Sequence, residues 1–207
     1  MSLSARDNPQ ATDRDGPGLG RQLRADARRN RERILEVAFA AFAGEGLSVS
    51  VHEIARRAGV GTGTVSRHFP SKESLFAAVY ISRVEWLASL AEELAVADDA
   101  GDAFFDFFEA LVAESAANRG LSDALTGVGF DIKAATSGPG RDVTAALGGL
   151  LTRAQRTGAV RPDLEAADVI ALVAGCLGRQ SDPTARSRLV SVVRAGLRSA
   201  PPSPGAE

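Results

Sequence analysis

The chain has 207 residues, of which 44% are hydrophobic and 24% charged, a balance typical of a globular protein rather than a disordered one. No apolar run approaches the roughly 18 residues that a membrane-spanning helix needs. The first twenty residues lack the apolar centre of a signal peptide. A single cysteine, Cys176, excludes an internal disulfide framework and is typical of a reducing compartment. We therefore expect a cytoplasmic protein without a membrane partner.

Charge is distributed unevenly along the chain, although the formal net charge is only −2. Residues 21–76 contain ten Lys and Arg against six Asp and Glu, whereas residues 77–207 contain twelve against seventeen. A basic segment followed by an acidic remainder is the pattern expected when one end of a protein binds a polyanion.

The first part of the chain divides into two segments before any apolar periodicity begins. Residues 1–20 are rich in Gly, Pro, Asp and Ser, and we expect a disordered tail there. The arginine-dense segment 21–33 has two interpretations. It is either the solvated start of a helix or an arm that contacts DNA phosphates or the minor groove.

Three helices are predicted between residues 28 and 69. Apolar residues at positions 34, 35, 38, 39 and 42 form one face of a helix over about 28–43, which Gly44 and Gly46 end. Ser50 and Glu53 then form a capping-box pattern, in which the hydroxyl accepts an N–H bond and the carboxylate reaches back to the cap. A short helix over 51–58, a turn at Gly59 and a second short helix over about 62–69 follow. Together they form a helix-turn-helix, the unit that reads the DNA major groove.

The remaining chain also predicts helices. Pro70 ends the preceding helix, and Ser71 can cap a long helix that reaches Val96. Further helices are predicted over 102–117, 142–157, 164–177 and 183–198, and Gly127 and Gly129 leave the segment 121–135 ambiguous. We expect residues 200–207 to form a disordered tail. The predicted fold is all-α: an N-terminal three-helix DNA-binding head followed by a C-terminal helical domain.

The head resembles a known family over about fifty residues. The matching residues are Arg33-Ile34-Leu35, Phe42, Gly46, Ile54-Ala55, Ala58-Gly59-Val60, Val65 and the run HFPSKESLF from His68 to Phe76. They are similar to the N-terminal domain of TetR-family transcriptional regulators, also called the TetR/AcrR type. The resemblance implies a DNA-binding domain over residues 21–76, with its helix-turn-helix at about 51–69. It also implies a helical ligand-binding and dimerisation domain over 77–199.

The same resemblance implies which residues bind DNA. Residues of the second short helix face bases and flanking phosphates, and residues at or near the ends of the helix-turn-helix hold the phosphate backbone. The first group is Thr62, Gly63, Thr64, Ser66 and Arg67, and the second is Ser50, His68 and Lys72. The family commonly has tyrosine where this sequence has Ser66, so the aromatic contact made there by relatives does not carry over.

The resemblance further implies a ligand-responsive repressor that binds a palindromic operator as a homodimer. The last two helices, at about 164–177 and 183–198, are expected to form the dimer interface. Large apolar side chains in the body predict an apolar cavity and a small apolar or aromatic effector, although each of them also fits an ordinary helical core. The candidate lining residues are Trp86, Leu90, Phe104, Phe107, Phe108, Leu111, Leu125, Phe130, Leu147 and Leu151.

The same sequence also bears on nucleotide binding, catalysis and an architectural role. The glycines at 59, 61 and 63 superficially resemble a phosphate-binding loop, but a helical segment with two arginines precedes them where such a loop needs a buried strand. Both histidines lie in the head and no Cys/His metal spacing exists, so we predict no catalytic residue, metal site or cofactor. The alternatives are a ligand-independent architectural DNA-binding protein and a helical enzyme that uses carboxylate chemistry.

Overall fold

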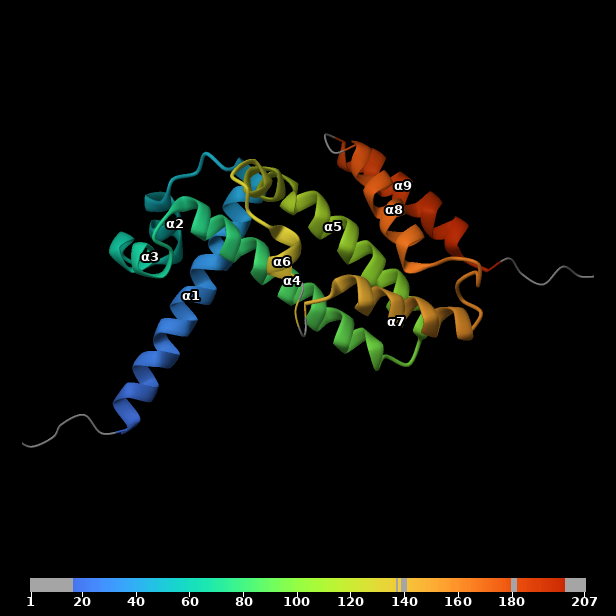
Figure 1. The fold of residues 1–207 in the computed structure, drawn as a ribbon, viewed down its shortest axis with the longest axis horizontal. Helices are drawn as coiled ribbons and strands as arrows, with labels where there is room; N and C mark the ends of the chain where they lie inside the picture. The colour runs from blue at the N-terminus through green and yellow to red at the C-terminus, as the bar shows by residue number, and fades with distance from the viewer. Residues whose placement is uncertain (1–16, 137, 139–140, 180–181, 200–207) are drawn as a thin grey trace, which may run out of the picture.

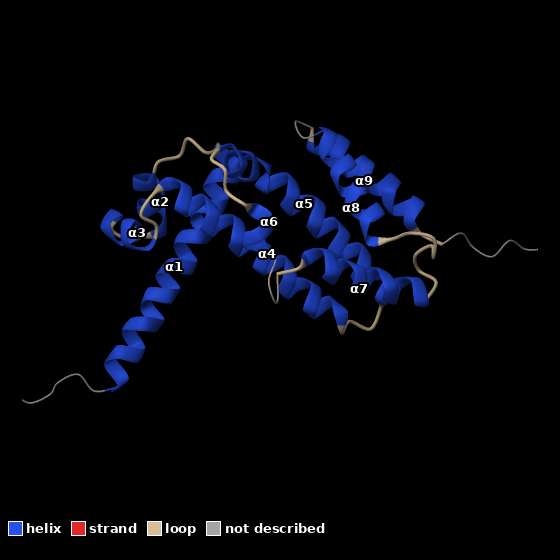
Figure 2. Cartoon of the chain, in the orientation of Figure 1, coloured by secondary structure: helices blue, strands red, loops and turns tan. Residues whose placement is uncertain are grey.

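The computed structural model describes residues 17–136, 138, 141–179 and 182–199. Within these ranges the chain is almost entirely helical, and β pairing is limited to an isolated bridge between Val160 and Arg198 (Figure 2). The helices are α1 (Pro17–Glu45), α2 (Val51–Ala58), α3 (Thr62–His68), α4 (Lys72–Ala95), α5 (Ala100–Gly127), α6 (Ile132–Thr136), α7 (Val143–Arg156), α8 (Ala166–Cys176), the 3-10 helix η1 (Leu177–Arg179) and α9 (Pro183–Leu197). The expected all-α fold is confirmed, and the tail segments 1–16 and 200–207 lie outside the described residues.

The head and the body lie at opposite ends of an elongated molecule (Figure 1). Helices α1 to α3 form the head, and α4 leads from it into the body, where it packs against α5 and α7. Helices α8 and α9 lie together at the end of the body farthest from the head.

Helix α1 begins at Pro17, well before the predicted start near Arg28. Residues 17–20 are therefore helical and do not belong to a disordered tail. The first half of α1 projects away from the rest of the molecule (Figure 1). Good helix formers and exposed ion pairs such as Arg28–Glu32 stabilise this half without a buried face, which is why apolar periodicity does not reveal it. The segment 21–33 is thus a mostly exposed part of a helix, and its contact with DNA stays a prediction.

The apolar core of the head includes residues of the body. Ile34 of α1, Ile54 of α2 and Val65 of α3 are fully buried together. Leu121 and Leu125, at the end of α5, are equally buried in the same cluster. The division between a head domain and a body domain at residue 76 therefore crosses a continuous core.

Helices α4 and α5 are the long elements that carry this connection. Ser71 caps α4 as expected, since its hydroxyl accepts from the Ser74 N–H at 3.1 Å and the Ser74 hydroxyl accepts from the Ser71 N–H at 3.0 Å. By length and composition alone α4 could cross a membrane, but it packs against α1, α5 and α7. Helix α5 continues without a break to Gly127, through the first half of the segment that glycines left ambiguous, because Leu121 and Leu125 extend its buried face.

The core of the body is built around α5. Phe104, Phe105, Phe107 and Phe108 are each at most 1% exposed. Phenylalanines at these four positions span an arc of roughly 160° around a helix, so burial of all four requires neighbours over nearly half of the circumference of α5. Near the start of this helix a Cβ on Gly101 would lie 2.7 Å from the Ala159 side chain, so only glycine allows the two segments to approach this closely.

Substitution of Leu125 tests the shared core. Leu125→Ala should lower the free energy of unfolding by about 2–5 kcal/mol, because it opens a cavity between head and body. Val128→Ala is the control, since Val128 lies one turn further on and is 62% exposed, and it should change stability by less than about 0.5 kcal/mol. Chemical denaturation of both variants measures the difference, and equal effects would show that α5 does not support the head.

Candidate functional site

The helix-turn-helix begins with a partly formed capping box. The Ser50 hydroxyl accepts from the Glu53 N–H at 3.2 Å, as the sequence predicts. The Glu53 carboxylate does not reach back to the cap and instead accepts from Arg56 at 2.8 Å and 2.6 Å and from Arg57 at 2.7 Å. That half of the prediction is wrong, because two arginines one turn away offer the carboxylate charge-assisted hydrogen bonds.

The turn between α2 and α3 places the second helix on the surface of the head. Gly59 adopts φ +67°, the left-handed conformation that ends α2. Val65 is fully buried and anchors the inner side of α3. The Thr62 hydroxyl lies 3.3 Å from Nδ1 of His52, which links the start of α3 to α2. The outer side of α3 is thereby held in a fixed position relative to α2.

The predicted DNA-binding residues lie on α3 and at the starts of α2 and α4, and their contact with DNA stays a prediction. The residues Ser50, Thr62, Gly63, Ser66 and Arg67 are exposed, and Thr64, His68 and Lys72 are half-buried. The ring of His68 lies 6.0 Å from the Phe69 ring, and Nζ of Lys72 lies 5.7 Å from the Phe76 ring. Both side chains therefore lie beside aromatic rings of the head core and are also partly exposed.

The two arginines of α2 form ion pairs with nearby carboxylates. Hydrogen bonds from Arg56 and Arg57 lower the pKa of Glu53 to about 2. Hydrogen bonds to Glu45 and Glu53 raise the pKa of Arg57. In contrast, Arg67 on α3 forms no hydrogen bond or ion pair through its guanidinium with any residue in the described part of the chain. Arg67 is thus available for an external acceptor, whereas the two arginines of α2 already have carboxylate partners.

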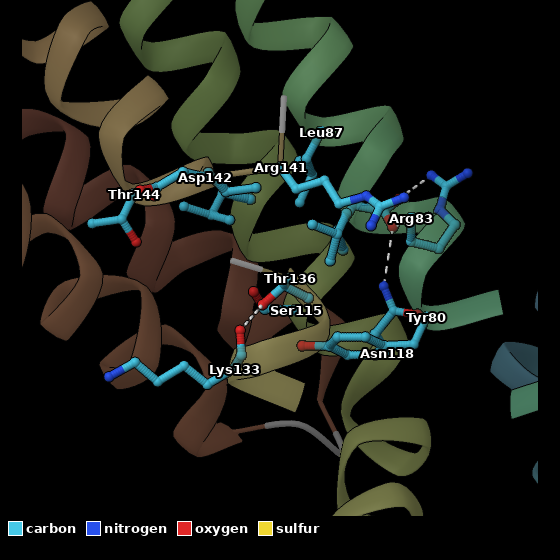
Figure 3. Close-up of a pocket in the computed structure, with 14 residues that line it drawn as sticks. Tyr80, Arg83, Leu87, Ser115, Asn118, Lys133, Thr136, Arg141, Asp142 and Thr144 are labelled. Atoms are coloured by element: carbon cyan, nitrogen blue, oxygen red, sulfur yellow. Dashed lines mark hydrogen bonds and ion pairs between the residues drawn. The ribbon is translucent and has the colours of Figure 1, made fainter. Parts of the chain in front are cut away.

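A cavity of about 480 Å³ lies in the body between α4, α5, α6 and the start of α7 (Figure 3). This volume is in the range of small-molecule sites. Its walls combine a few apolar side chains with many polar and charged ones. The lining residues are Tyr80, Arg83, Val84, Leu87, Leu111, Glu114, Ser115, Asn118, Lys133, Thr136, Arg141, Asp142, Val143 and Thr144.

Most of the predicted cavity residues lie elsewhere, and of the ten only Leu111 lines this cavity. Five belong to the closed core of the body, namely Phe104, Phe107, Phe108, Leu147 and Leu151. Leu90 packs partly buried against that core, and Trp86 is 41% exposed. Leu125 and Phe130 line a separate hollow of about 410 Å³ beside the head. Nine of the ten candidates therefore do not line this cavity, and their contact with a ligand stays a prediction.

Charged groups on the cavity wall are connected to one another. Arg83 donates to the Glu114 carboxylate at 2.8 Å and 2.5 Å, and the Asn118 amide donates to it at 3.2 Å. Arg141 donates to Glu85 at 2.9 Å. Glu114 and Asn118 are the buried polar residues of α5, and they follow Leu111 at helical spacing. Polar residues that interrupt an apolar stripe were therefore the sequence signal that could have indicated the polar part of the cavity wall.

Comparison with known proteins covers both the head and the body. The family model for bacterial regulatory proteins of the tetR family matches residues 34–79. The model for the C-terminal domain of SbtR-like transcriptional regulators matches residues 99–199. The solved TetR transcription regulatory protein of Mycobacterium vanbaalenii is 46% identical, with a TM-score of 0.71 over 85% of this chain and 99% of that one.

This chain belongs to the TetR family. A solved TetR transcriptional regulator of Streptomyces coelicolor is 31% identical and also has a TM-score of 0.71, over 83% of this chain and 99% of that one. An HTH-type transcriptional regulator of Staphylococcus aureus is 44% identical over 54 residues, which is 26% of this chain and 29% of the relative. As a TetR-family protein, the chain is a DNA-binding transcriptional regulator of a family that is not enzymatic.

Arg67 offers a direct test of base reading by this TetR-family head. Arg67→Ala should weaken binding to the cognate operator by about 1–3 kcal/mol, with less effect on random DNA, because arginine binds guanine through two hydrogen bonds. Arg56→Ala is the matched control on α2, and its effect should be smaller because Glu53 already holds that guanidinium. Fluorescence anisotropy with both DNAs measures the affinities. Equal losses on operator and random DNA would make Arg67 a backbone contact.

Proposed function

We propose that this TetR-family protein is a homodimeric repressor that binds a palindromic operator and is released by a small molecule bound in the body cavity. The position of the cavity is the observation that carries this proposal. One of its walls is α4, which begins at Lys72, directly after the short connection from the end of α3 at His68. A ligand that shifts α4 therefore changes the position of the recognition helix.

Such a ligand shifts the equilibrium between two positions of α4 by the difference between its binding free energies for them, typically about 1–3 kcal/mol. In a dimer, the two recognition helices must fit major grooves about 34 Å apart, so a small rotation of each head lowers operator affinity. A ligand-independent architectural protein does not need a cavity beside the helix that supports the recognition helix, which favours the regulator.

Exposed apolar residues at the far end of the body support dimerisation there. Val192 of α9 is 68% exposed and Ile170 of α8 is 36% exposed. Small residues that are also exposed on these helices allow close approach of a second copy: Ala171, Ala174, Gly175, Ala195 and Gly196. An isologous interface buries such a surface on both subunits at once.

Selection of bound sequences from random DNA, followed by a salt titration on the selected site, tests the DNA-binding part of the proposal. If each head contacts about four phosphates, log K against log salt concentration should have a slope near −7 for the dimer. The selected sequences should contain two inverted half-sites. A shallow slope or a single half-site would contradict binding by a dimer through both heads.

The proposed interface is tested by Val192→Glu. A buried carboxylate without a partner should dissociate the dimer, so that sedimentation yields monomer and operator affinity falls at least roughly tenfold, the equivalent of 1.4 kcal/mol. Val96→Glu is the control, because Val96 is 83% exposed at the end of α4. A dimer that persists in Val192→Glu would place the interface elsewhere.

A further inference from the structure

The excess positive charge of the head lies in the projecting half of α1 and not on the helix-turn-helix (Figure 1). Residues 21–33 contain six arginines against two acidic residues, whereas residues 34–76 contain four Lys and Arg against four Asp and Glu. Two of these four cations, Arg56 and Arg57, are also ion-paired with carboxylates of the head. Neutralisation of phosphates by cations supplies nearly all of a protein's sequence-independent affinity for DNA. The helix-turn-helix alone therefore carries little of the charge that binding to DNA requires.

Four of the six arginines share one face of α1. They follow one another at spacings of three, four and three residues, which places them within an arc of about 80° around the helix. These four exposed residues form the arginine stripe: Arg21, Arg24, Arg28 and Arg31.

The two acidic residues of this half of α1 leave the arginine stripe positively charged. Asp26 pairs with Arg29, which lies off the stripe. Glu32 lies 3.6 Å from Arg28, and the side chains of this pair are 59% and 75% exposed. An exposed ion pair at this distance is weak, so Arg28 can exchange it for a phosphate.

The arginine stripe is continuous with the proposed DNA-binding surface of the head. At the same spacing along α1 it is followed by Leu35, Ala38 and Phe42, which are buried in the head core. The arginines therefore lie on the side of α1 that faces the rest of the head. Where the two parts meet, the guanidinium of Arg31 lies 5.4 Å from the ring of Phe69, the residue that ends α3. One line of side chains thus leads from the end of α3 along the projecting half of α1.

The dimensions of a helix decide which part of DNA this half of α1 can contact. The arginine stripe is about 15 Å long, at about 1.5 Å per residue, and B-DNA carries one charge per about 1.7 Å of its axis, so several phosphates lie within reach. A helix with its side chains is about 10 Å wide, whereas the minor groove is about 6 Å wide. The helical form of this segment therefore favours contact with the phosphate backbone over insertion into the minor groove.

We propose that the arginine stripe is a second DNA-binding element, which binds backbone phosphates beside the half-site that α3 reads and supplies much of the sequence-independent affinity of the head. This inference rests on the proposed operator binding and adds a contact outside the helix-turn-helix. The occupant is DNA rather than an acidic protein surface, because the stripe leads directly from the end of α3.

The proposal is tested by the double variant Arg21→Gln/Arg28→Gln. Glutamine forms helices about as well as arginine, so α1 should persist, which circular dichroism and thermal melting check. Affinities for the selected operator and for random DNA should both fall, by roughly tenfold or more, because phosphate contacts do not depend on sequence. For the dimer, the slope of log K against log salt concentration should become shallower by about 3.6, since each of four lost contacts contributes about 0.9.

Arg29→Gln/Arg33→Gln is the matched control. It removes the same charge from the same helix, but at positions about 120° and 160° from the centre of the arginine stripe. Each double variant also removes one ion-paired arginine, Arg28 or Arg29. The control should change the slope by less than about 1, because charges that contact no phosphate are screened by salt. Fluorescence anisotropy with both DNAs over a range of salt concentrations measures all of these values.

The outcomes separate this inference from the proposed function. If the control loses as much affinity and slope as the stripe variant, or if neither variant loses any, the arginine stripe does not bind phosphates. Selected operators with A·T-rich flanks that the stripe variant no longer prefers would place the arginines in the minor groove and overturn the phosphate contact. A wild-type protein that selects no operator would refute the proposed function, whereas loss of affinity for random DNA in the stripe variant alone would still support the stripe.

Discussion

Leu121 and Leu125 of α5 pack into the same core as Ile34, Ile54 and Val65 of the head, and the position of the DNA-binding surface depends on this contact. Helices of only eight and seven residues, such as α2 and α3, have too few internal hydrogen bonds to be stable alone. Their geometry therefore comes from the apolar groups against which they pack. Because part of that apolar surface belongs to the body, any movement of α5 relative to α4 would be transmitted to the head by packing.

Local sequence signals were sufficient for most of the fold. Ser50, Ser71, Asp142 and Asp182 each precede a helix and accept a backbone N–H at its start, and the amphipathic spacing identifies α2 to α4, α7 and α9. The long N-terminal extension of α1 was missed because an exposed helix needs no apolar period. The continuity of α5 was missed because its glycine signals lie at the end of the helix, and only the burial of Leu121 and Leu125 shows that it continues that far.

The helix-turn-helix was predictable because it follows a local pattern, whereas the cavity was not. A cavity is formed by residues that are distant in sequence, and its lining depends on how completely the core around it packs. The phenylalanines of α5 fill their surroundings, so the space is left where Arg83, Glu114 and Asn118 pair with one another instead of with apolar neighbours. Large apolar residues in a sequence therefore predict the core better than they predict a ligand site.

The pairing of Glu53 with Arg56 and Arg57 has a consequence for how the protein searches a genome. Non-specific attraction to DNA grows with each cation that replaces a counterion, and two of the arginines on the helix-turn-helix are already neutralised within the head. These two arginines are therefore expected to add less to non-specific binding than unpaired cations would, so that the choice between an operator and unrelated DNA depends more on the contacts that read bases.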